Sequence, residues 1–116
     1  MPQEPLALEE IPGSVDGHRI LRLLGPVTIS NLYEFQSKVR ADRSATLILD
    51  LTRVPYVDSA AIGALVGAYV THEKQGRGLL LVGVNERVLN ALKVTRVEQF
   101  FKFFETVDSA ERASST

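Results

Sequence analysis

The stretch from Ala45 to Gly63 reads Ala-Thr-Leu-Ile-Leu-Asp-Leu-Thr-Arg-Val-Pro-Tyr-Val-Asp-Ser-Ala-Ala-Ile-Gly. Its first seven residues are almost all apolar over the length of one strand, which is typical of a strand inside a sheet that is covered on at least one face. A turn through residues 52–57 leads to Asp58 and Ser59, where a helix is expected to begin and to continue until Gly76 ends it. One face of this helix is apolar and carries Ile62, Leu65, Val66, Tyr69 and Val70.

Before this stretch, two segments are predicted to form an antiparallel hairpin. Residues 6–11 and 18–25 are rich in apolar side chains, and the turn-forming segment 12–17 between them is short. A helix is expected next, because apolar residues recur at helical spacing after Thr28 and Ser30, either of which is a suitable cap. This helix should end near residue 41.

After Gly76 the pattern alternates again between strand and helix. The predicted elements are a strand at 78–84, a helix at 86–94, an edge strand at 100–105 and a helix at 107–113. Right-handed crossovers would place the helices mainly on one side of a mixed β-sheet, because the connections are short. The fold class is therefore α/β, with one domain over residues 1–116 and a frayed tail at 113–116.

Composition narrows the classes of function. The chain has 116 residues and a net charge of −1, which gives no field for a nucleic acid. It contains no cysteine and two histidines, so no metal, redox role or cofactor is expected. The longest apolar stretch, 60–70, is too short to cross a bilayer, and the acidic segment 1–10 lacks the features of a signal peptide. A cytoplasmic protein is therefore expected.

Two residue pairs within 50–63 indicate a family. Asp50-Leu51 ends the central strand, and Asp58-Ser59 follows an aromatic-aliphatic pair and precedes a helix. This arrangement resembles the STAS family, of the anti-sigma factor antagonist type, and the order of elements fits over almost the whole chain. The resemblance implies that Ser59 is the phosphoacceptor, and that the chain binds protein partners and is not an enzyme.

Elementary electrostatics agrees with this implication. A phosphate on Ser59 would add about −1.5 to −2 charge to a surface intended for a partner, which would oppose docking. Phosphorylation would thus act as an off switch. Aspartate and serine are also common helix caps, so Asp58 can cap the helix while Ser59 points outward.

The chain departs from the family pattern at three positions. Phosphorylated members commonly continue with Ser or Thr and then Gly, whereas this chain has Ala60 and Ala61. After the Gly-Pro turn, where the family often carries an aspartate, this chain has Thr28. The predicted switch-loop and partner-binding residues beside Ser59 are Thr28, Tyr56, Asp58, Ala60, Ala61 and Gly63.

The predicted helix after Ser59 contains several small residues. They are Gly63, Ala64, Gly67 and Ala68. Such residues allow close approach either of a partner helix or of the domain's own sheet, and the second use is the commoner one. A serine hydrolase is excluded, because His72 lies 13 residues after Ser59 on the same predicted helix, about 20 Å away.

The leading hypothesis is an anti-sigma factor antagonist. It would bind a serine-kinase anti-sigma factor, free a sigma factor for transcription, and be reset by a PP2C-type phosphatase, as a monomer or weak homodimer. The alternative is a non-catalytic STAS subunit of a lipid-transport or other transporter complex, or a stressosome scaffold. Ala60 and Ala61 slightly favour this alternative. A ligand-binding module has no positive signal in the sequence.

Overall fold

A five-stranded sheet organises the chain in the computed structural model, which describes residues 5–114. The strand order is β1-β2-β3-β4-β5; β1 is antiparallel to β2, and every other neighbouring pair is parallel. The strands are β1 Ala7–Pro12, β2 His18–Leu24, β3 Thr46–Arg53, β4 Gly78–Val82 and β5 Lys102–Phe104. The helices are α1 Leu32–Ala41, α2 Ser59–Lys74, α3 Glu86–Val94 and α4 Val107–Ser114, with a 3-10 helix at Glu98–Phe100.

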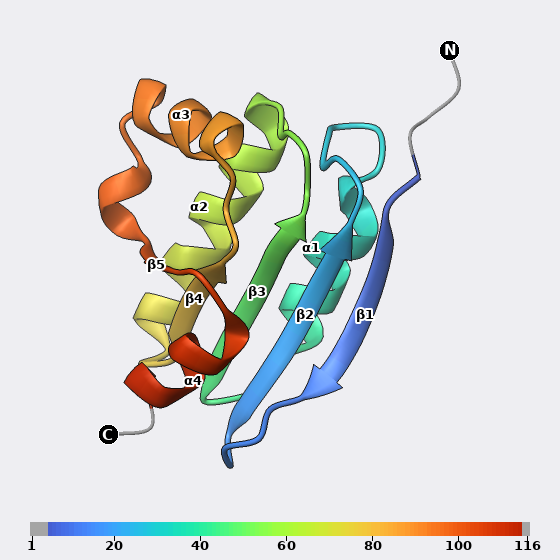
Figure 1. The fold of residues 1–116 in the computed structure, drawn as a ribbon. Coiled ribbons are helices and arrows are strands. Elements are labelled where there is room, and N and C mark those ends of the chain that lie inside the picture. The colour runs from blue at the N-terminus through green and yellow to red at the C-terminus, as the bar shows by residue number, and fades with distance from the viewer. Residues whose placement is uncertain (1–4, 115–116) are drawn as a thin grey trace.

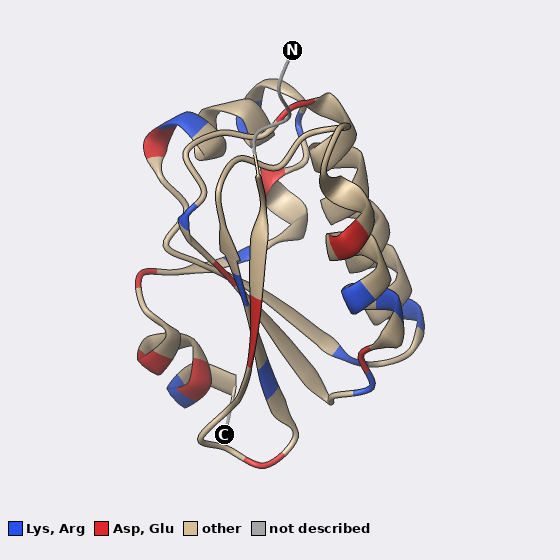
Figure 2. Cartoon of the chain, turned by 90° about the vertical axis from the view of Figure 1, so that its right-hand side faces the viewer, with Lys and Arg blue, Asp and Glu red and all other residues tan. Residues whose placement is uncertain are grey.

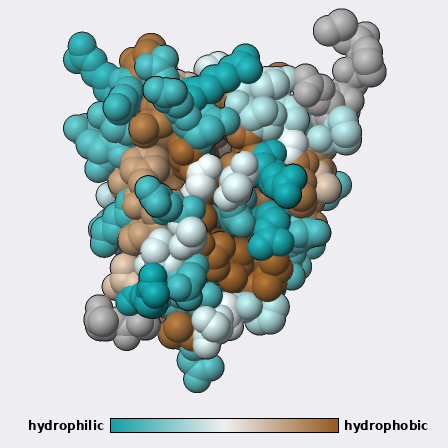
Figure 3. Space-filling model, viewed as in Figure 1, coloured by the Kyte–Doolittle hydropathy of each residue, from teal (hydrophilic) through white to brown (hydrophobic). Residues whose placement is uncertain are grey.

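The helices cover the two faces of the sheet unequally. Helices α1, α2 and α3 lie behind the sheet in Figure 1, and α4 lies in front of it. The larger core cluster contains Phe35, Leu49 and Leu65 and belongs to the first face, whereas the smaller one joins Ile48, Leu80 and Ala110 under α4. Figure 3, which views the α4 side, still shows brown apolar atoms between the polar ones. The predicted mixed sheet, with helices mainly on one side, is confirmed.

Period-two alternation explains why β3 reads as a continuous apolar run. Leu47, Leu49 and Leu51 face the larger cluster, while Ile48 faces the smaller one. All four side chains are at most 1% exposed. Both faces of β3 are thus buried. The chain runs from the carboxyl end of β3 to the start of α2.

One predicted helix cap is wrong. Helix α1 has Asn31 as its N-cap, without a side-chain capping bond, in place of Thr28 or Ser30. Helix α4 continues to Ser114, one residue past its predicted end, and the Ser114 hydroxyl donates to the carbonyl of Ala110 at 3.0 Å. The fraying of the tail at 113–116 stays a prediction. Residues 115–116 of that predicted tail lie outside the described residues.

The described residues contain neither a membrane-spanning helix nor a metal-binding cluster. Between residues 5 and 114, no helix has the length and apolar character needed to cross a membrane. Over the same range, no group of three or more His, Cys, Asp or Glu residues could hold a metal ion.

Candidate functional site

The amino end of α2 is built around the carboxylate of Asp58. Asp58 is the N-cap residue in extended backbone conformation, and its Oδ1 accepts a hydrogen bond from the amide of Ala61 at 2.9 Å. The first amides of a helix lack partners within the helix, so this bond satisfies one of them. The predicted cap is therefore confirmed, and it fixes the direction in which the helix starts.

The second oxygen of Asp58 reaches a different loop. Its Oδ2 accepts a hydrogen bond from the amide of Ile29 at 2.9 Å. Beside it, Val27 and Val57 form an isolated parallel bridge, in which Asp58 N donates to Val27 O at 3.2 Å. The β2–α1 loop and the β3–α2 loop are thus held together as one surface at the carboxyl end of the sheet.

Ser59 lies at the first position of α2 and is exposed. The first turn of α2 contains no acidic residue. Helix amino ends carry partial positive charge and unpaired amides, which favour an added anionic group. Because Asp58 already fills the capping position, the Ser59 hydroxyl is left free to face solvent, as the sequence predicts.

The other predicted site residues occupy different environments. Thr28 is half-buried in the β2–α1 loop, where its hydroxyl lies 2.9 Å from that of Ser30. Tyr56 is also half-buried, and the guanidinium carbon of Arg87 lies 4.8 Å from the centre of its ring. Tyr56 therefore presents a cation–π pair at this end of the sheet.

Ala61 does not fit its predicted role as a partner contact. Its exposed fraction is 0%, and its side chain belongs to the larger core cluster. It acts through its backbone amide, which binds Asp58. Ala60, by contrast, is half-buried, and it lines a groove between α1 and α2.

Gly63 and Gly67 overturn the commoner expectation for the small residues of α2. Both are exposed, and a Cβ atom at either position would meet no heavy atom within 4 Å. Ala68 does pack into the core, with 6% exposure. The glycines therefore face outward into the groove, and only part of the small-residue set serves packing on the sheet.

Two large apolar residues near the switch loop were not predicted from the sequence. Ile29 is 74% exposed and Tyr33 is 73% exposed. They are four residues apart, across the start of α1, and Ile29 is held by Asp58. Exposed apolar side chains beside a polar rim are typical of protein-binding surfaces. The sequence could have indicated their exposure, because neither residue belongs to an apolar helical pattern that would place it in the core.

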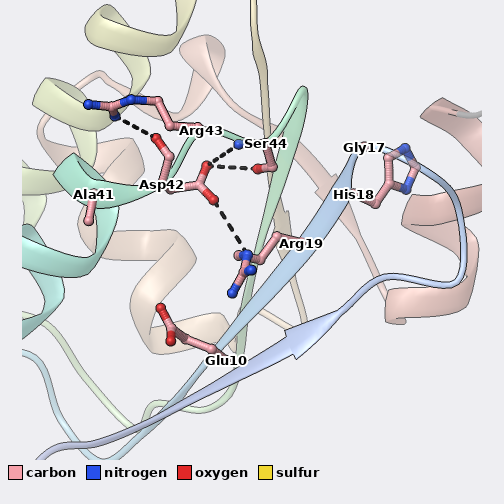
Figure 4. A pocket seen from close by; sticks show the side chains of 8 residues that line it. All are labelled: Glu10, Gly17, His18, Arg19, Ala41, Asp42, Arg43 and Ser44. Atoms are coloured by element: carbon pink, nitrogen blue, oxygen red, sulfur yellow. Dashed lines mark hydrogen bonds and ion pairs between the residues drawn. The ribbon is translucent and has the colours of Figure 1, made fainter.

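A polar pocket of about 520 Å³ lies at the opposite end of the sheet, around Asp42. Figure 4 shows Asp42 between Arg19 and Ser44, with Glu10 and His18 on either side. Its carboxylate accepts from the Ser44 hydroxyl at 2.7 Å. It also pairs with Arg77 on the far side, so this buried group joins the end of α1 to the chain after α2.

Asp50 of the family-like Asp-Leu pair also has a structural role. Burial opposes its ionisation, but hydrogen bonds from the hydroxyl and amide of Thr52 and from Arg22 outweigh this effect and lower the pKa of its carboxyl. The charged form is therefore the stable one, and it joins the end of β3 to Arg22 of β2.

The chain is similar to known proteins over nearly its whole length. The family model of the STAS domain matches residues 10–110 of the chain. A candidate anti-sigma factor antagonist from Thermotoga maritima has a TM-score of 0.86 at 23% identity, covering 94% of this chain and 95% of that protein. The phosphorylated form of the Bacillus cell fate determinant SpoIIAA has a TM-score of 0.71 at 14% identity, covering 92% and 99% of the two chains.

A membrane transporter also contains this fold. The murine anion transporter Slc26a9 matches with a TM-score of 0.75 at 23% identity. The match covers 98% of this chain but 23% of the transporter chain. At such identities, the solved structures establish a shared fold.

Proposed function

Because this chain belongs to the STAS domain family, we propose that it is a cytoplasmic anti-sigma factor antagonist. In this proposal it binds a serine-kinase anti-sigma factor and is switched off by phosphorylation of Ser59. The observation that carries the proposal is the exposed Ser59 at the first position of α2, immediately after a fully engaged Asp58. The existence of a phosphorylated form of SpoIIAA, which shares the fold, supports it.

The surface around Ser59 has the composition that a protein partner requires. Ile29 and Tyr33 offer apolar anchors, and Asp58 fixes the loop that carries Ile29. Aromatic and aliphatic anchors inside a polar rim contribute most of the affinity at protein interfaces. The unmodified surface would therefore bind its partner through apolar contacts.

Phosphorylation would change this surface without unfolding it. A phosphate on Ser59 is compatible with the positive helix end, so the helix itself is not destabilised. The partner, however, would have to desolvate about −1.5 to −2 of added charge next to Asp58. Release of the partner follows, and a PP2C-type phosphatase would restore the binding form. The proposed role requires no catalytic group from this chain.

The test is a phosphorylation and binding assay. The protein is incubated with ATP and each serine-kinase anti-sigma factor of its source organism, and phosphopeptides are mapped by mass spectrometry. Label is expected at Ser59 and is lost in Ser59→Ala. Calorimetry should then show tight binding for Ser59→Ala and at least tenfold weaker binding for Ser59→Asp, which is about 1.4 kcal/mol.

A matched control separates position from charge. Gln99 is exposed in the 3-10 helix at Glu98–Phe100 and does not line the groove, so Gln99→Glu adds one negative charge at a different place. It should bind like the unmodified protein. Label confined to other residues, or equal affinities for Ser59→Ala and Ser59→Asp, would refute the switch.

A second candidate is a non-catalytic subunit of a transporter complex. The shared fold with part of Slc26a9 favours it, as does the absence of a second hydroxyl at Ala60 and Ala61. Affinity purification from the native cell distinguishes the two proposals. Recovery of a transporter ATPase in stoichiometric amount supports the second candidate, whereas recovery of a small kinase supports the first.

A further inference from the structure

A groove of about 610 Å³ runs between α1 and α2 on the outer side of the larger core. Along α2 and its C-cap its lining extends from Ala60 to Gln75, which corresponds to about 22 Å at 1.5 Å per residue. Phe35 and Val39 of α1 line the other side and are themselves buried. The groove therefore starts next to Ser59 and follows the whole of α2.

The floor of this groove leaves room for another backbone to approach closely. Gly63 and Gly67 line it, and neither would bring an added Cβ within 4 Å of another heavy atom. Glycine is among the poorest helix formers, so two of them within α2 weaken the helix. Packing among residues 5–114 does not require them. A second backbone lying along α2 would make use of the space that they leave.

The charges around the groove have one sign. Its lining includes Arg40, Arg43 and Arg77 and contains no aspartate or glutamate. Arg77 is paired with Asp42 at 3.1 Å. Arg43 donates to the backbone carbonyls of Arg40 and Asp42.

The guanidinium charges of Arg40 and Arg43 are thus not neutralised. Within residues 5–114, no carboxylate lies within 4.0 Å of either group. Figure 2 shows Lys and Arg gathered toward the lower end of the helices on its right-hand side. The whole chain has a net charge of −1, so the basic end of the groove is a local feature. It is complementary to an acidic ligand.

Building on the proposed switch, we propose that the partner protein lays an acidic amphipathic helix in the α1–α2 groove. The apolar face of that helix would contact Gly63 and Gly67, and its acidic side chains would lie near Arg40 and Arg43. A helix of about 15 residues matches the 22 Å length. Helix-in-groove docking uses such an elongated surface between two helices.

This arrangement also explains how one phosphate could control the interface. Ser59 precedes Ala60, which lines the amino end of the groove. An acidic helix attracted by Arg40 and Arg43 would be repelled by a phosphate at the other end. The same charge pattern on the partner thus accounts for both binding and release.

The test uses the absence of cysteine from this chain. Gly67→Cys places a single thiol in the groove, and Glu73→Cys places one at an exposed α2 position outside the lining. Alkylation by iodoacetamide is followed by mass spectrometry, with and without the kinase that labels Ser59. Binding should slow alkylation of Gly67→Cys at least tenfold and leave Glu73→Cys nearly unchanged. Equal rates for the two thiols in the complex would overturn the inference.

Substitutions test the two contacts separately. Gly67→Leu fills the groove and should weaken binding at least tenfold, whereas Glu73→Leu should not. Arg40→Glu should weaken binding by a similar factor, and more strongly at low salt than at high salt. The same thiol also tests for a lipid site. If oleate protects Gly67→Cys from alkylation and the partner protein does not, the groove is a lipid site and the inference is overturned.

The outcomes distinguish this inference from the function on which it rests. If Ser59→Asp loses binding while Gly67→Leu and Arg40→Glu bind normally, the switch stands and the groove is not used. If Ser59→Asp binds normally, the switch itself is wrong. Retained cooperative unfolding in urea shows that each variant is folded.

Discussion

The carboxylate of Asp58 accepts a hydrogen bond from the amide of Ile29 at 2.9 Å, across 29 positions of sequence. Its other oxygen caps α2 through Ala61. One side chain therefore sets both the start of the helix that carries Ser59 and the loop that displays Ile29, the most exposed large hydrophobic residue among residues 5–114. Any change in the charge or position of Asp58 should therefore alter both the start of α2 and the loop that carries Ile29.

Asp58→Ala should lower stability and loosen the Ile29 loop. Loss of an N-cap costs about 1 kcal/mol, and the amide of Ile29 also loses its acceptor. Asn85 caps α3 in the same way, through the amide of Val88 at 2.8 Å, so Asn85→Ala is the matched control. Urea unfolding should show a loss in both variants, but hydrogen exchange at Ile29 should accelerate only in Asp58→Ala. Similar exchange in both variants would contradict this role.

Gly83 should tolerate no side chain. Its φ is +70°, and an added Cβ would collide with the side chain of Thr52. Gly76 has a similar φ of +68° but would meet no heavy atom within 4 Å. Gly76→Ala should therefore cost about 1 kcal/mol through backbone strain, and Gly83→Ala should cost clearly more in urea unfolding. Equal losses would show that Thr52 moves aside freely.

Glu111 should anchor α4 to the hairpin turn. Its buried carboxylate accepts from the amides of Ser14 at 2.9 Å and Val15 at 3.2 Å, and it lies 3.2 Å from His18 Nδ1. Burial opposes ionisation, but the hydrogen bonds outweigh it and lower the pKa of Glu111. Stability from this group is therefore full above its ordinary pKa of 4.5 and is lost as the pH falls through the lower folded value.

Glu111→Gln tests this anchor by urea unfolding at neutral and acidic pH. At neutral pH the variant should lose about 1–3 kcal/mol, because the neutral amide oxygen is a weaker acceptor than the buried carboxylate. Its stability should then depend less on pH in the acidic range. Asp108 is exposed on the same helix, so Asp108→Asn should change stability by less than about 0.5 kcal/mol. A loss in Asp108→Asn as large as that in Glu111→Gln would contradict the role.

Local patterns predicted the sheet and helices well, because β3 and α3 bury residues at regular spacing. The predicted helix at 86–94 coincides with α3, and the cap at Asp58 follows from residue type. Contacts between residues distant in sequence could not be predicted from such patterns. The Asp58–Ile29 bond, the burial of Ala61 and the outward position of Gly63 depend on how the helices pack on the sheet. The predicted role of Ser59 stays a prediction until it is tested.

His72 should make the protein less stable as the pH falls below neutrality. Its side chain is 1% exposed, and its Nδ1 lies 2.8 Å from the carbonyl oxygen of Ala68. Burial lowers the pKa of His72, and the nearby Arg77 acts in the same direction, whereas the Ala68 carbonyl and Asp42 oppose the shift. The folded protein therefore takes up this proton less readily than the unfolded chain does.

The sign of the pH effect follows from this difference. Above the ordinary histidine pKa of 6.5, both states are neutral and the stability is full. As the pH falls below that value, the unfolded chain is protonated first and the free energy of unfolding decreases, until the folded protein titrates at its lower pKa. Urea unfolding between about pH 8 and about pH 5 should show this decrease. His72→Gln should flatten it, because the variant lacks the buried imidazole while the rest of the chain, including His18, is unchanged. An unchanged slope in His72→Gln would assign the pH dependence to another group.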